Sequence, residues 1–377
     1  MLKKKMVAVV FQVLITAFAI LLCFNFSNNV LAQLPNLTQL NYNMSSGLSP
    51  YTIGDFEKLL GKVDKELISF CSEQKEFSIK EEIVTPVITN EWYFENYDTI
   101  LHGRGFTEEN LLSKDKVIVI SDKLALKLFF NTEAVGKTLM LNNEVYTICG
   151  IYSESDLLIN KLSSDGKQRV YIPYTSFEEY QNCEIDTISY SHQAFSAPII
   201  EQMNLQQYNF TDFAEKAKVI KNFKHIMLLL VFIMSAVISL KIWHKQCRKY
   251  ISEIRDNLKE NYFAKSLLSI PLKYILFLIN AIGIPLLLLM VLFVSDFSIY
   301  IVSKYIPYDN IFDVSYYLEM ITENENLKNT LTLTGNTYLL NLYSNSFSVL
   351  IWFTIIYVIL AIPIIAKIVS FVDKKIK

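Results

Sequence analysis

Four long apolar runs stand out along the chain. Val7–Phe24, Tyr274–Val294 and Phe347–Ala366 contain 18, 21 and 20 residues without a charged side chain. A further run, Ile226–Leu240, is shorter and extends to Trp243. A helix rises 1.5 Å per residue, so about 20 residues cross a hydrocarbon core of about 30 Å. The pattern therefore predicts one membrane-spanning helix near the N-terminus and three in the C-terminal half.

The first run also fits a cleaved signal peptide. Lys3–Lys5 precede it, and Val-Leu-Ala before Gln33 fits a cleavage site. The run exceeds the roughly 7–15 apolar residues of a signal peptide, which favours an uncleaved anchor. Leu22 stands before Cys23, where a lipoprotein cysteine needs a small residue, so lipidation is not expected.

Positive charges are distributed unevenly between the loops. Lys3–Lys5 precede the first run, eight Lys and Arg residues lie within 241–273, and four lysines follow the last run. The stretch 295–346 holds only Lys304 and Lys328. Cytoplasmic loops are enriched in Lys and Arg. Both termini and the loop after the second span are therefore expected in the cytoplasm, and the other two connecting regions outside.

The region between the first two spans, about 190 residues long, is large enough to form its own core. Val117–Ile120 predicts a short buried strand. Ser121 can cap a helix through about Asn131, because its hydroxyl can accept a bond from a free backbone N–H. Leu124 and Leu128 lie on one face of this helix, together with Ala125 and Phe129, and that face is predicted to meet the core.

The last three residues of the stretch NTEAVGKT (131–138) are Gly-Lys-Thr, which is also how a nucleotide-binding loop ends. Such a loop leaves a strand and opens a helix, so that backbone N–H groups bind phosphate. Here Asn131 replaces the first glycine, and a helix is predicted before the stretch. Two strands, Thr138–Leu141 and Glu144–Ile151, are predicted after it, joined at Asn142–Asn143, where asparagine tolerates positive φ. We interpret the stretch as the turn from a helix into a hairpin.

Three further elements are predicted before the second span. Val170–Pro173 predicts a strand that ends at proline. Thr175–Tyr180 predicts a short helix. Asp212 and Glu215, three residues apart, predict a capped helix start. Residues 212–243 are expected to form one helix that begins outside and enters the bilayer as a stalk.

Composition narrows the functional classes. The hydrophobic fraction of 52% and the mean hydropathy of +0.28 indicate a membrane protein with a soluble part. A net charge of −2 gives no support for nucleic-acid binding. The cysteines and histidines show no metal-ligand spacing, so no metal site is predicted, and neither a cofactor site nor a catalytic nucleophile–base pair is recognisable. Cys149 is expected to be a small core residue, and a disulfide between Cys71 and Cys183 is left open.

Several segments of the external region resemble one known family. They are HGRGFTEEN (102–110), VIVISDKLALKLFFNTEAVGKTLMLNNEVYTICGI (117–151) and VYIPYTSF (170–177). Together they resemble the periplasmic core domain of MacB-type permeases, which are FtsX-like, type VII ABC transporter permeases. The four spans and the basic loop between the second and third also match that family.

The resemblance implies a permease subunit without catalysis of its own. Two copies, identical or different, would pair with two cytoplasmic ABC ATPase subunits that carry ATP and Mg. ATP hydrolysis would move the external domain through the stalk helices, a mechanism called mechanotransmission. Export of or resistance to peptides or antibiotics, and regulation of lipoproteins or the cell wall, are the roles found in such a family. The expected partners are an ATPase, a second permease copy and membrane lipid.

The segment that contacts the ATPase in the family is degenerate in this chain. Only SEIRDNLKENYF (252–263) is recognisable, with the family's glycines absent. The resemblance assigns the candidate ATPase-contact residues to this loop: Arg248, Lys249, Glu253, Ile254 and Arg255. About 50 residues, 295–346, replace a short external loop, either as a docking element or as a loop without function.

The predicted fold is an α+β external domain on an all-α membrane domain of four transmembrane helices with stalk helices. The predicted domains are residues 1–31 for the first span, 32–225 for the extracytoplasmic core domain and 226–377 for the membrane domain. Within the membrane domain, spans are predicted at about 226–243, 274–294 and 347–366. A cytoplasmic loop is predicted at 244–273 and an external loop at 295–346. The leading hypothesis is an ABC permease subunit in the cell membrane. The alternative is a membrane-anchored external scaffold or binding protein that has lost ATPase coupling.

Overall fold

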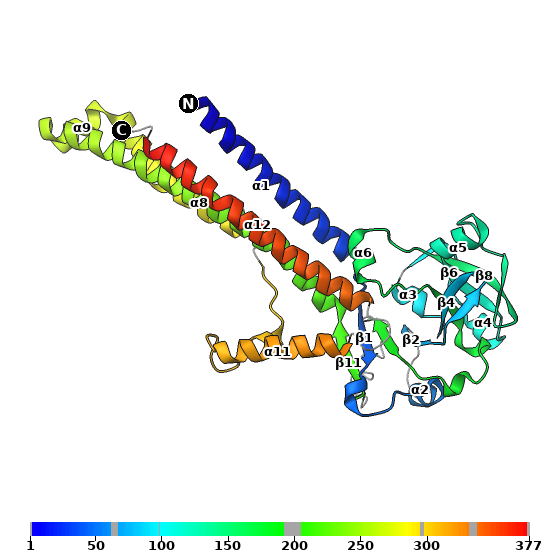
Figure 1. The fold of residues 1–377 in the computed structure, drawn as a ribbon. Helices are drawn as coiled ribbons and strands as arrows, with labels where there is room; N and C mark the ends of the chain where they lie inside the picture. Colours follow the sequence, from blue (N-terminus) through cyan, green and yellow to red (C-terminus); the bar gives the residue numbers. More distant parts are fainter. Residues whose placement is uncertain are drawn as a thin grey trace. The chain divides into compact units, whose positions relative to one another are not determined.

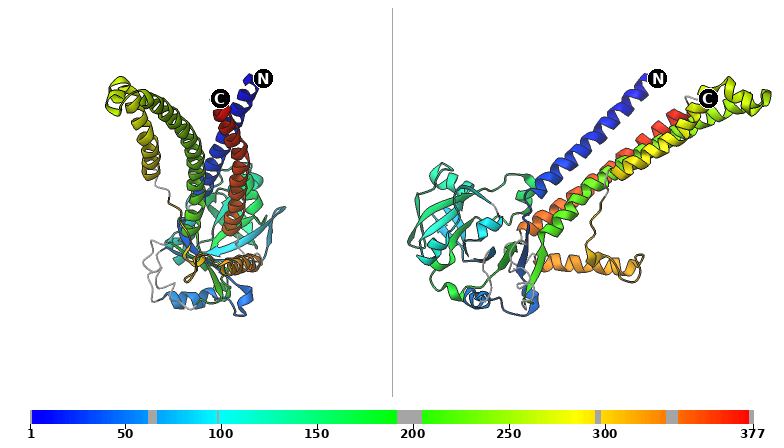
Figure 2. Two further views of the ribbon diagram at one scale, coloured as in Figure 1. Left: turned by 90° about the vertical axis from the view of Figure 1, so that its left-hand side faces the viewer. Right: turned by 180° about the vertical axis from the view of Figure 1, so that it is seen from behind.

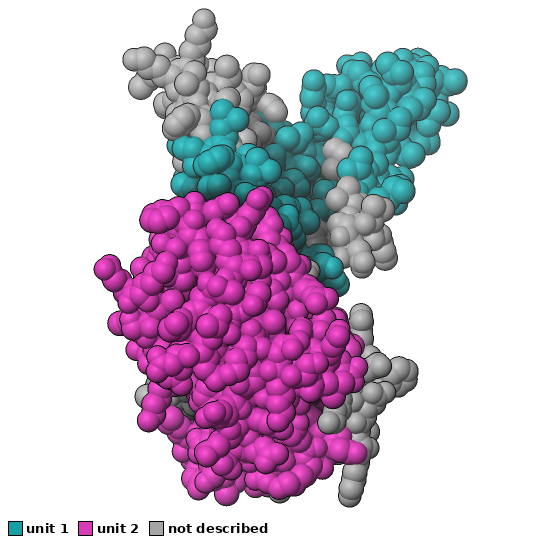
Figure 3. Space-filling view, turned by 90° about the vertical axis from the view of Figure 1, so that its right-hand side faces the viewer, with its two compact units in different colours: residues 1–29, 219–300, 348–377 teal, residues 30–218, 301–347 magenta. Residues whose placement is uncertain are grey.

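A computed structural model describes residues 2–61, 67–97, 99–191, 205–294, 298–331 and 338–374. The chain divides into two compact units (Figure 3). The helical unit comprises residues 1–29, 219–300 and 348–377, and the sheet unit comprises residues 30–218 and 301–347.

The described residues of the sheet unit form eleven strands. They are β1 Leu37–Tyr42, β2 Ile68–Glu73, β3 Phe77–Ile79, β4 Glu82–Thr89, β5 Ile100–Gly103, β6 Val117–Ser121, β7 Thr138–Leu141, β8 Glu144–Tyr152, β9 Arg169–Pro173, β10 Thr187–Ser191 and β11 Tyr208–Asp212. Their order is β11-β1-β10-β2-β4-β9-β6-β8-β5, with β3 beside β4 and β7 beside β8. The β4–β9 and β6–β8 pairs are parallel, and the other pairs are antiparallel.

Short helices complete the sheet unit (Figure 1). They are α2 Ile53–Leu60, α3 Tyr93–Tyr97, α4 Glu108–Leu112, α5 Asp122–Phe129, α6 Leu158–Ser163 and α11 Val314–Leu331, with 3₁₀ turns η1 Met44–Ser46, η2 Tyr174–Ser176, η3 Tyr180–Asn182 and η4 Ser303–Tyr305. Long helices α1 Leu2–Leu31, α8 Phe213–Glu260, α10 Pro271–Val294 and α12 Tyr338–Lys374, with the short α9 Phe263–Ser269, supply the helical unit (Figures 1 and 2).

The centre of the sheet, around β6, is buried on both faces. Side chains alternate along a strand, so Ile118 and Ile120 of β6 join the larger core cluster, while Val119 between them joins a second cluster. Leu124 of α5 packs into the larger cluster, and Tyr93 of α3 packs into the second. Burial on both sides explains why the β6 sequence is uniformly apolar instead of alternating.

The predicted strand, helix and hairpin of the 117–151 region are confirmed. Ser121 caps α5, with its Oγ accepting a hydrogen bond from the Leu124 N–H at 3.1 Å. The hairpin turns at Asn142 and Asn143, whose φ angles are 49° and 61°. Gly136, with φ of 85°, lies between α5 and β7. A helix therefore precedes the Gly-Lys-Thr tripeptide and a strand follows it, the reverse of a nucleotide-binding loop.

A close approach between β5 and β8 requires two glycines. A Cβ on Gly103 would collide with the carbonyl oxygen of Cys149, and one on Gly150 would collide with the carbonyl oxygen of Arg104. Gly103 also has φ of 77°, which L side chains rarely adopt. The two strands meet at a register irregularity beside these positions.

One expectation for the sheet unit needs correction. The helix predicted over Thr175–Tyr180 is wrong, because two 3₁₀ turns, η2 and η3, replace it. Tyr174, Phe177 and Tyr180 are spaced by three residues and all pack on the larger core cluster, a spacing that suits 3₁₀ geometry. The strand Val170–Pro173 is confirmed within β9.

The disulfide left open between two external cysteines is not formed. All five cysteines lie among the described residues, and no disulfide joins any two of them. Cys71 belongs to the second core cluster, whereas Cys183 packs against the larger one. Their positions on different clusters of the sheet explain why the two thiols do not meet.

Among the residues that the structure describes, four helices are long and apolar enough to cross a membrane, and they fit the four predicted spans. The helix predicted from Asp212 is longer than expected, because α8 continues from Phe213 to Glu260. Its first turn is capped as predicted, with the Asp212 carboxylate accepting a bond from the Glu215 N–H at 3.0 Å. Within the helical unit, the rings of Phe26 and Phe353 lie 6.1 Å apart, so that α1 meets α12.

Candidate functional site

The loop predicted to contact an ATPase forms a helical hairpin in the helical unit. α8 ends at Glu260, α9 follows after two residues, and α10 begins at Pro271. Lys273 pairs with Glu253 at 2.9 Å, which joins the start of α10 to α8. The Ser266 and Tyr274 hydroxyls are 3.0 Å apart, which joins α9 to α10. These bonds hold α9 across the end of the hairpin.

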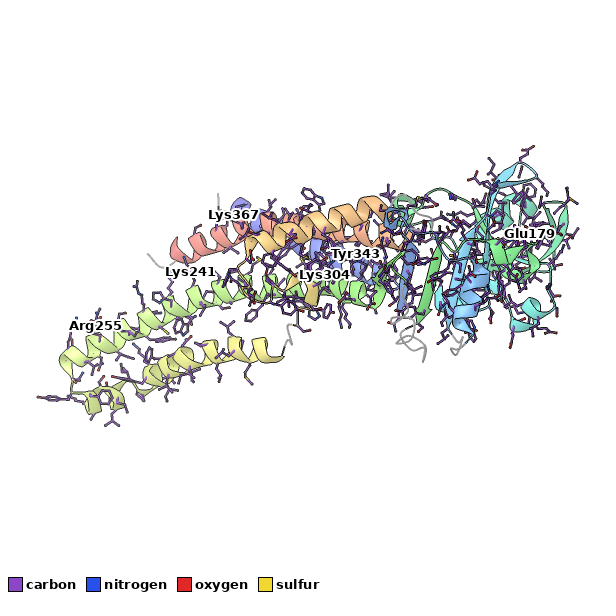
Figure 4. All side chains as sticks on the ribbon, turned by 90° about the horizontal axis from the view of Figure 1, so that it is seen from below. Glu179, Lys241, Arg255, Lys304, Tyr343 and Lys367 are labelled. Carbon is purple, nitrogen blue, oxygen red and sulfur yellow. The ribbon has the colours of Figure 1, made fainter. Side chains whose placement is uncertain are left out.

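The five predicted contact residues divide into two groups. Arg248, Lys249 and Arg255 are exposed, and Figure 4 labels Arg255 near the end of α8. Glu253 is bound to Lys273, and Ile254 is half-buried. The three cations are therefore available to a partner, whereas Glu253 mainly stabilises the hairpin itself. Whether these residues bind an ATPase stays a prediction.

The α9 helix exposes an apolar surface that the sequence reasoning missed. Phe263 and Leu268 are 64% and 80% exposed, and Tyr262 and Leu267 are exposed beside them. The signal in the sequence is an apolar segment, FAKSLLS, that follows polar Asn261 and lies outside every predicted span. Large exposed apolar side chains gathered on one short helix are typical of a surface that contacts another protein or a membrane.

A second candidate site is a polar joint within the sheet unit, where α6 meets the first turns of α12. Asn341 Nδ2 donates to the Ser163 carbonyl oxygen and Asn345 Nδ2 donates to the Leu162 carbonyl oxygen, both at 3.4 Å. Asn345 Nδ2 also lies 3.2 Å from Ser163 Oγ. Residues 341 and 345 are one helical turn apart and share a face of α12. Their amides satisfy carbonyls at the C-terminus of α6 that a helix leaves unpaired.

Asn160 extends this joint to the end of α1. Its Nδ2 donates to Gln33 Oε1 at 2.6 Å and to the Tyr338 hydroxyl oxygen at 2.8 Å. Gln33 lies two residues beyond α1, and Tyr338 is the first residue of α12. A displacement of either chain segment would therefore act directly on α6. No sequence pattern predicts this joint, because its partners are more than 100 residues apart.

Paired charges lie close to the joint. Arg169 of β9 is 11% exposed and binds the carboxylates of Glu73 at 2.6 Å and Asp165 at 2.5 Å. Burial disfavours the charged guanidinium, but the hydrogen bonds to Asp165 and the charge of Glu73 raise the pKa of Arg169 above its usual value. Burial raises the pKa of Tyr171 to about 12. These groups therefore keep one protonation state at neutral pH.

Comparison with known proteins identifies the family. A family model described as the MacB-like periplasmic core domain matches residues 6–197, just over half of the chain. The chain belongs to this family. It is a MacB-like, FtsX-like type VII ABC transporter permease, as the 102–177 motifs predicted. The matched range of this MacB-like permease runs from α1 through β10.

Solved structures similar to this MacB-like permease include two external domains of transporters. The periplasmic region of MacB from Actinobacillus actinomycetemcomitans is 15% identical, with 50% of this chain and 93% of that chain covered and a TM-score of 0.38. The extracellular domain of the noncanonic ABC-type transporter YknZ from Gram-positive bacteria is 20% identical, with 46% and 90% covered and a TM-score of 0.34. No curated protein matches the chain.

Family membership confirms the coarse predictions. The chain is an ABC transporter permease with an extracytoplasmic domain and apolar membrane helices. MacB-like permeases work with ABC ATPases and are generally non-catalytic.

Proposed function

We propose that this permease couples ATP hydrolysis by a separate cytoplasmic ABC ATPase to movement of its external domain. The observation that supports this most directly is α8, one uninterrupted helix of 48 residues. It begins immediately after β11 of the sheet and ends at the hairpin that presents α9. One continuous helix thus connects, along the chain, the edge strand β11 to the candidate ATPase contact.

The proposal includes an orientation and an assembly. Both termini and the α8–α9–α10 hairpin face the cytoplasm, and the sheet unit faces outside, as the distribution of Lys and Arg predicts. Two permease copies, identical or related, bind two ATPase subunits that carry ATP and Mg. The external movement serves export of or resistance to peptides or antibiotics, or regulation of lipoproteins or the cell wall.

The exposed apolar side chains of α9 support extending the proposed contact from the predicted loop residues to α9. The exposed side chains of Phe263 and Leu268 would enter an apolar groove on the ATPase, with Arg248, Lys249 and Arg255 at the rim. Apolar anchors surrounded by charged rim residues are typical of protein interfaces.

The test is purification of the tagged full chain in mild detergent, with identification of co-purifying proteins and a vanadate-sensitive ATPase assay. The unmodified chain should retain a stoichiometric subunit with an intact nucleotide-binding loop. Replacement of both Phe263 and Leu268 by serine should release it. The matched control replaces Phe130 and Leu112 of the sheet unit, which are 89% and 77% exposed, and should leave the complex intact. Retention of the ATPase by the α9 variant would place the contact elsewhere.

A second test separates a direct contact from support of the hairpin. Joint replacement of Glu253, Ile254 and Arg255 by alanine should also weaken the complex. Lys273→Ala breaks only the pair with Glu253. If Lys273→Ala releases the ATPase as completely as the triple variant does, then Glu253 acts by holding the hairpin together.

The alternative function is a membrane-anchored scaffold or binding protein without ATPase coupling. The degenerate 252–263 segment supports it, because Glu253 is bound within the hairpin and the family's glycines are absent. This hypothesis predicts that no ATPase co-purifies and that the cellular phenotype survives the α9 variant.

A further inference from the structure

The sheet unit contains a cavity of about 840 Å³ beside the α6 joint. It is bounded by α3, the end of β8, α6, the segment after α1 and the first turn of α12. Its volume lies within the range of roughly 300–1,000 Å³ found for small-molecule sites. Nothing in the proposed ATPase coupling uses this cavity.

Four tyrosine rings form a continuous wall of the cavity. The ring centroid of Tyr93 lies 4.6 Å from that of Tyr97 and 4.9 Å from that of Tyr171. Tyr152 extends the wall, with its centroid 5.4 Å from that of Tyr171. All four residues line the cavity. Aromatic walls bind the faces of flat or ring-shaped molecules through dispersion and edge contacts.

A buried acceptor in the lining has no partner. Asn160 is 4% exposed and lines the cavity. Both hydrogen bonds of its side chain use Nδ2, and its Oδ1 has no partner among the described residues. Asn96 also lines the cavity, and its Oδ1 likewise has no hydrogen-bond partner among the described residues. An unpaired buried acceptor costs about 1–3 kcal/mol, which a ligand with an N–H or O–H group would recover.

The charges around the cavity balance one another. Four cations line it, and each is bound to a carboxylate: Lys123 to Glu154 and Asp156, Lys161 to Asp156, Lys167 to Glu73, and Arg169 to Glu73 and Asp165. Four cations therefore face four carboxylates. A charged ligand would lose its hydration and find no unpaired counter-charge in this set, which disfavours its binding.

We propose that this cavity binds a small, uncharged, ring-bearing molecule that donates a hydrogen bond to Asn160. The ring lies against the wall of Tyr93, Tyr97, Tyr152 and Tyr171. The donor is an amide or hydroxyl group, and an acceptor group on the ligand accepts a hydrogen bond from the Tyr338 hydroxyl, whose oxygen already accepts one from Asn160. An aromatic amide and a pyranose sugar share this chemistry.

The test measures ligand binding by saturation-transfer NMR on the full chain in lipid nanodiscs, without an ATPase. The two neutral probes are N-acetyl-tyrosinamide and methyl N-acetyl-glucosaminide. Charged compounds with the same rings serve as comparisons. N-acetyl-tyrosine and tyrosinamide are compared with the first probe, and methyl glucosaminide is compared with the second. At least one neutral probe should bind saturably, and its charged relatives should bind at least about fivefold more weakly. The neutral probe that binds identifies the source of the ring.

Two variants test the assigned contacts. Asn160→Leu removes the unpaired acceptor and should weaken the neutral probe about 2- to 12-fold, the effect of one hydrogen bond. Tyr338→Phe removes a single hydroxyl, should weaken binding similarly, and keeps the test decisive if Asn160→Leu does not fold. Tyr42→Phe, which removes a hydroxyl bonded to the Leu48 carbonyl oxygen elsewhere in the sheet unit, is the matched control and should bind normally.

The proposal is overturned if no neutral probe binds saturably, if charged relatives bind equally well, or if the folded Tyr338→Phe chain binds as the unmodified chain does. The binding measurement needs no ATPase. A negative binding result would therefore reject this ligand site without contradicting the proposed coupling function. Conversely, if no ATPase co-purifies with the unmodified chain, the coupling function fails while the ligand-binding result is unaffected.

Discussion

The two units of the molecule use apolar residues in opposite ways. In the sheet unit, Leu124 and Ile120 are 0% exposed and lie in a continuous core. In the helical unit, Leu287 of α10 is 61% exposed. None of the side chains that the structure describes along Pro271–Met290 of α10 is buried. The first unit is stabilised by its own packing, and the second presents its apolar surface to lipid or to another chain. The same kind of apolar residue therefore contributes to the free energy of folding in the sheet unit. In the helical unit it contributes to the free energy of association with lipid or with another chain.

The largest expected effect comes from the sheet core. Leu124→Ala should lower the free energy of unfolding of the sheet unit by about 2–5 kcal/mol, because it leaves a cavity under α5. Leu287→Ala in α10 should change it by less than about 0.5 kcal/mol. Thermal unfolding of the full chain in detergent, followed by circular dichroism, measures both. Equal losses in the two variants would contradict the contrast between the units.

The next effect concerns the close approach of β5 and β8. Gly103→Ala should cost about 2–4 kcal/mol, because it adds a clash with the Cys149 carbonyl oxygen to the strain of a positive φ. Gly136→Ala has a similar φ, and a Cβ there meets nothing within 4 Å, so it should cost only about 1 kcal/mol. Equal losses in unfolding free energy would show that the backbone angle alone matters.

A titrating carboxyl group adds a pH dependence. Burial, followed by the charges of Glu73 and Glu184, raises the pKa of Asp186 from 3.8 to about 6, although its carboxylate accepts a hydrogen bond from the Glu73 N–H. The folded state therefore binds this proton more tightly than the unfolded state. Stability from this group is complete below about pH 4 and is lost as the pH rises through about 6.

Asp186→Asn should abolish that loss. The variant should gain about 1–2 kcal/mol over the unmodified chain at pH 7.5, below the limit of about 3 kcal/mol that the pKa difference sets. The gain should vanish near pH 4. Melting temperatures measured from pH 4 to pH 8 give the comparison. A gain of the same size at both ends of that range would assign the effect to packing instead of proton binding.

The smallest predicted effect is at the α6 joint. Asn345→Ala removes the amide that meets the Leu162 carbonyl oxygen and Ser163 Oγ, and should cost about 1 kcal/mol. Hydrogen exchange should increase in α6 and remain unchanged in α5. Uniform exchange across both helices would show that the joint does not act locally.

The sequence predicted those features whose cause is local. Ser121 before an apolar stripe, two asparagines between short strands and charge-free runs of about 20 residues each act over one element, and the structure has the cap, the hairpin and the four helices. The Thr175–Tyr180 helix failed because contacts of Tyr174, Phe177 and Tyr180 with the core override local preference.

Features that depend on distant partners could not be read from the chain. The pairing of β1 with β10 and β11 joins residues about 150 positions or more apart, and the α6 joint links residues 160, 33 and 338. The α9 surface had a local signal, but only the folded hairpin shows that Phe263 and Leu268 remain uncovered.

The unbroken α8 helix also has a rotational consequence. Its sequence contains no glycine or proline, whereas α10 contains Pro285 and α12 contains Pro363. With 3.6 residues per turn, one inserted residue would rotate everything beyond it by about 100°, and seven would restore the original facing within about 20°. We therefore expect the activity of the permease to vary with a helical period when one to seven alanines are inserted in α8. Such a period would indicate that rotation of α8 carries the signal, whereas a steady change with each insertion would indicate that its length does.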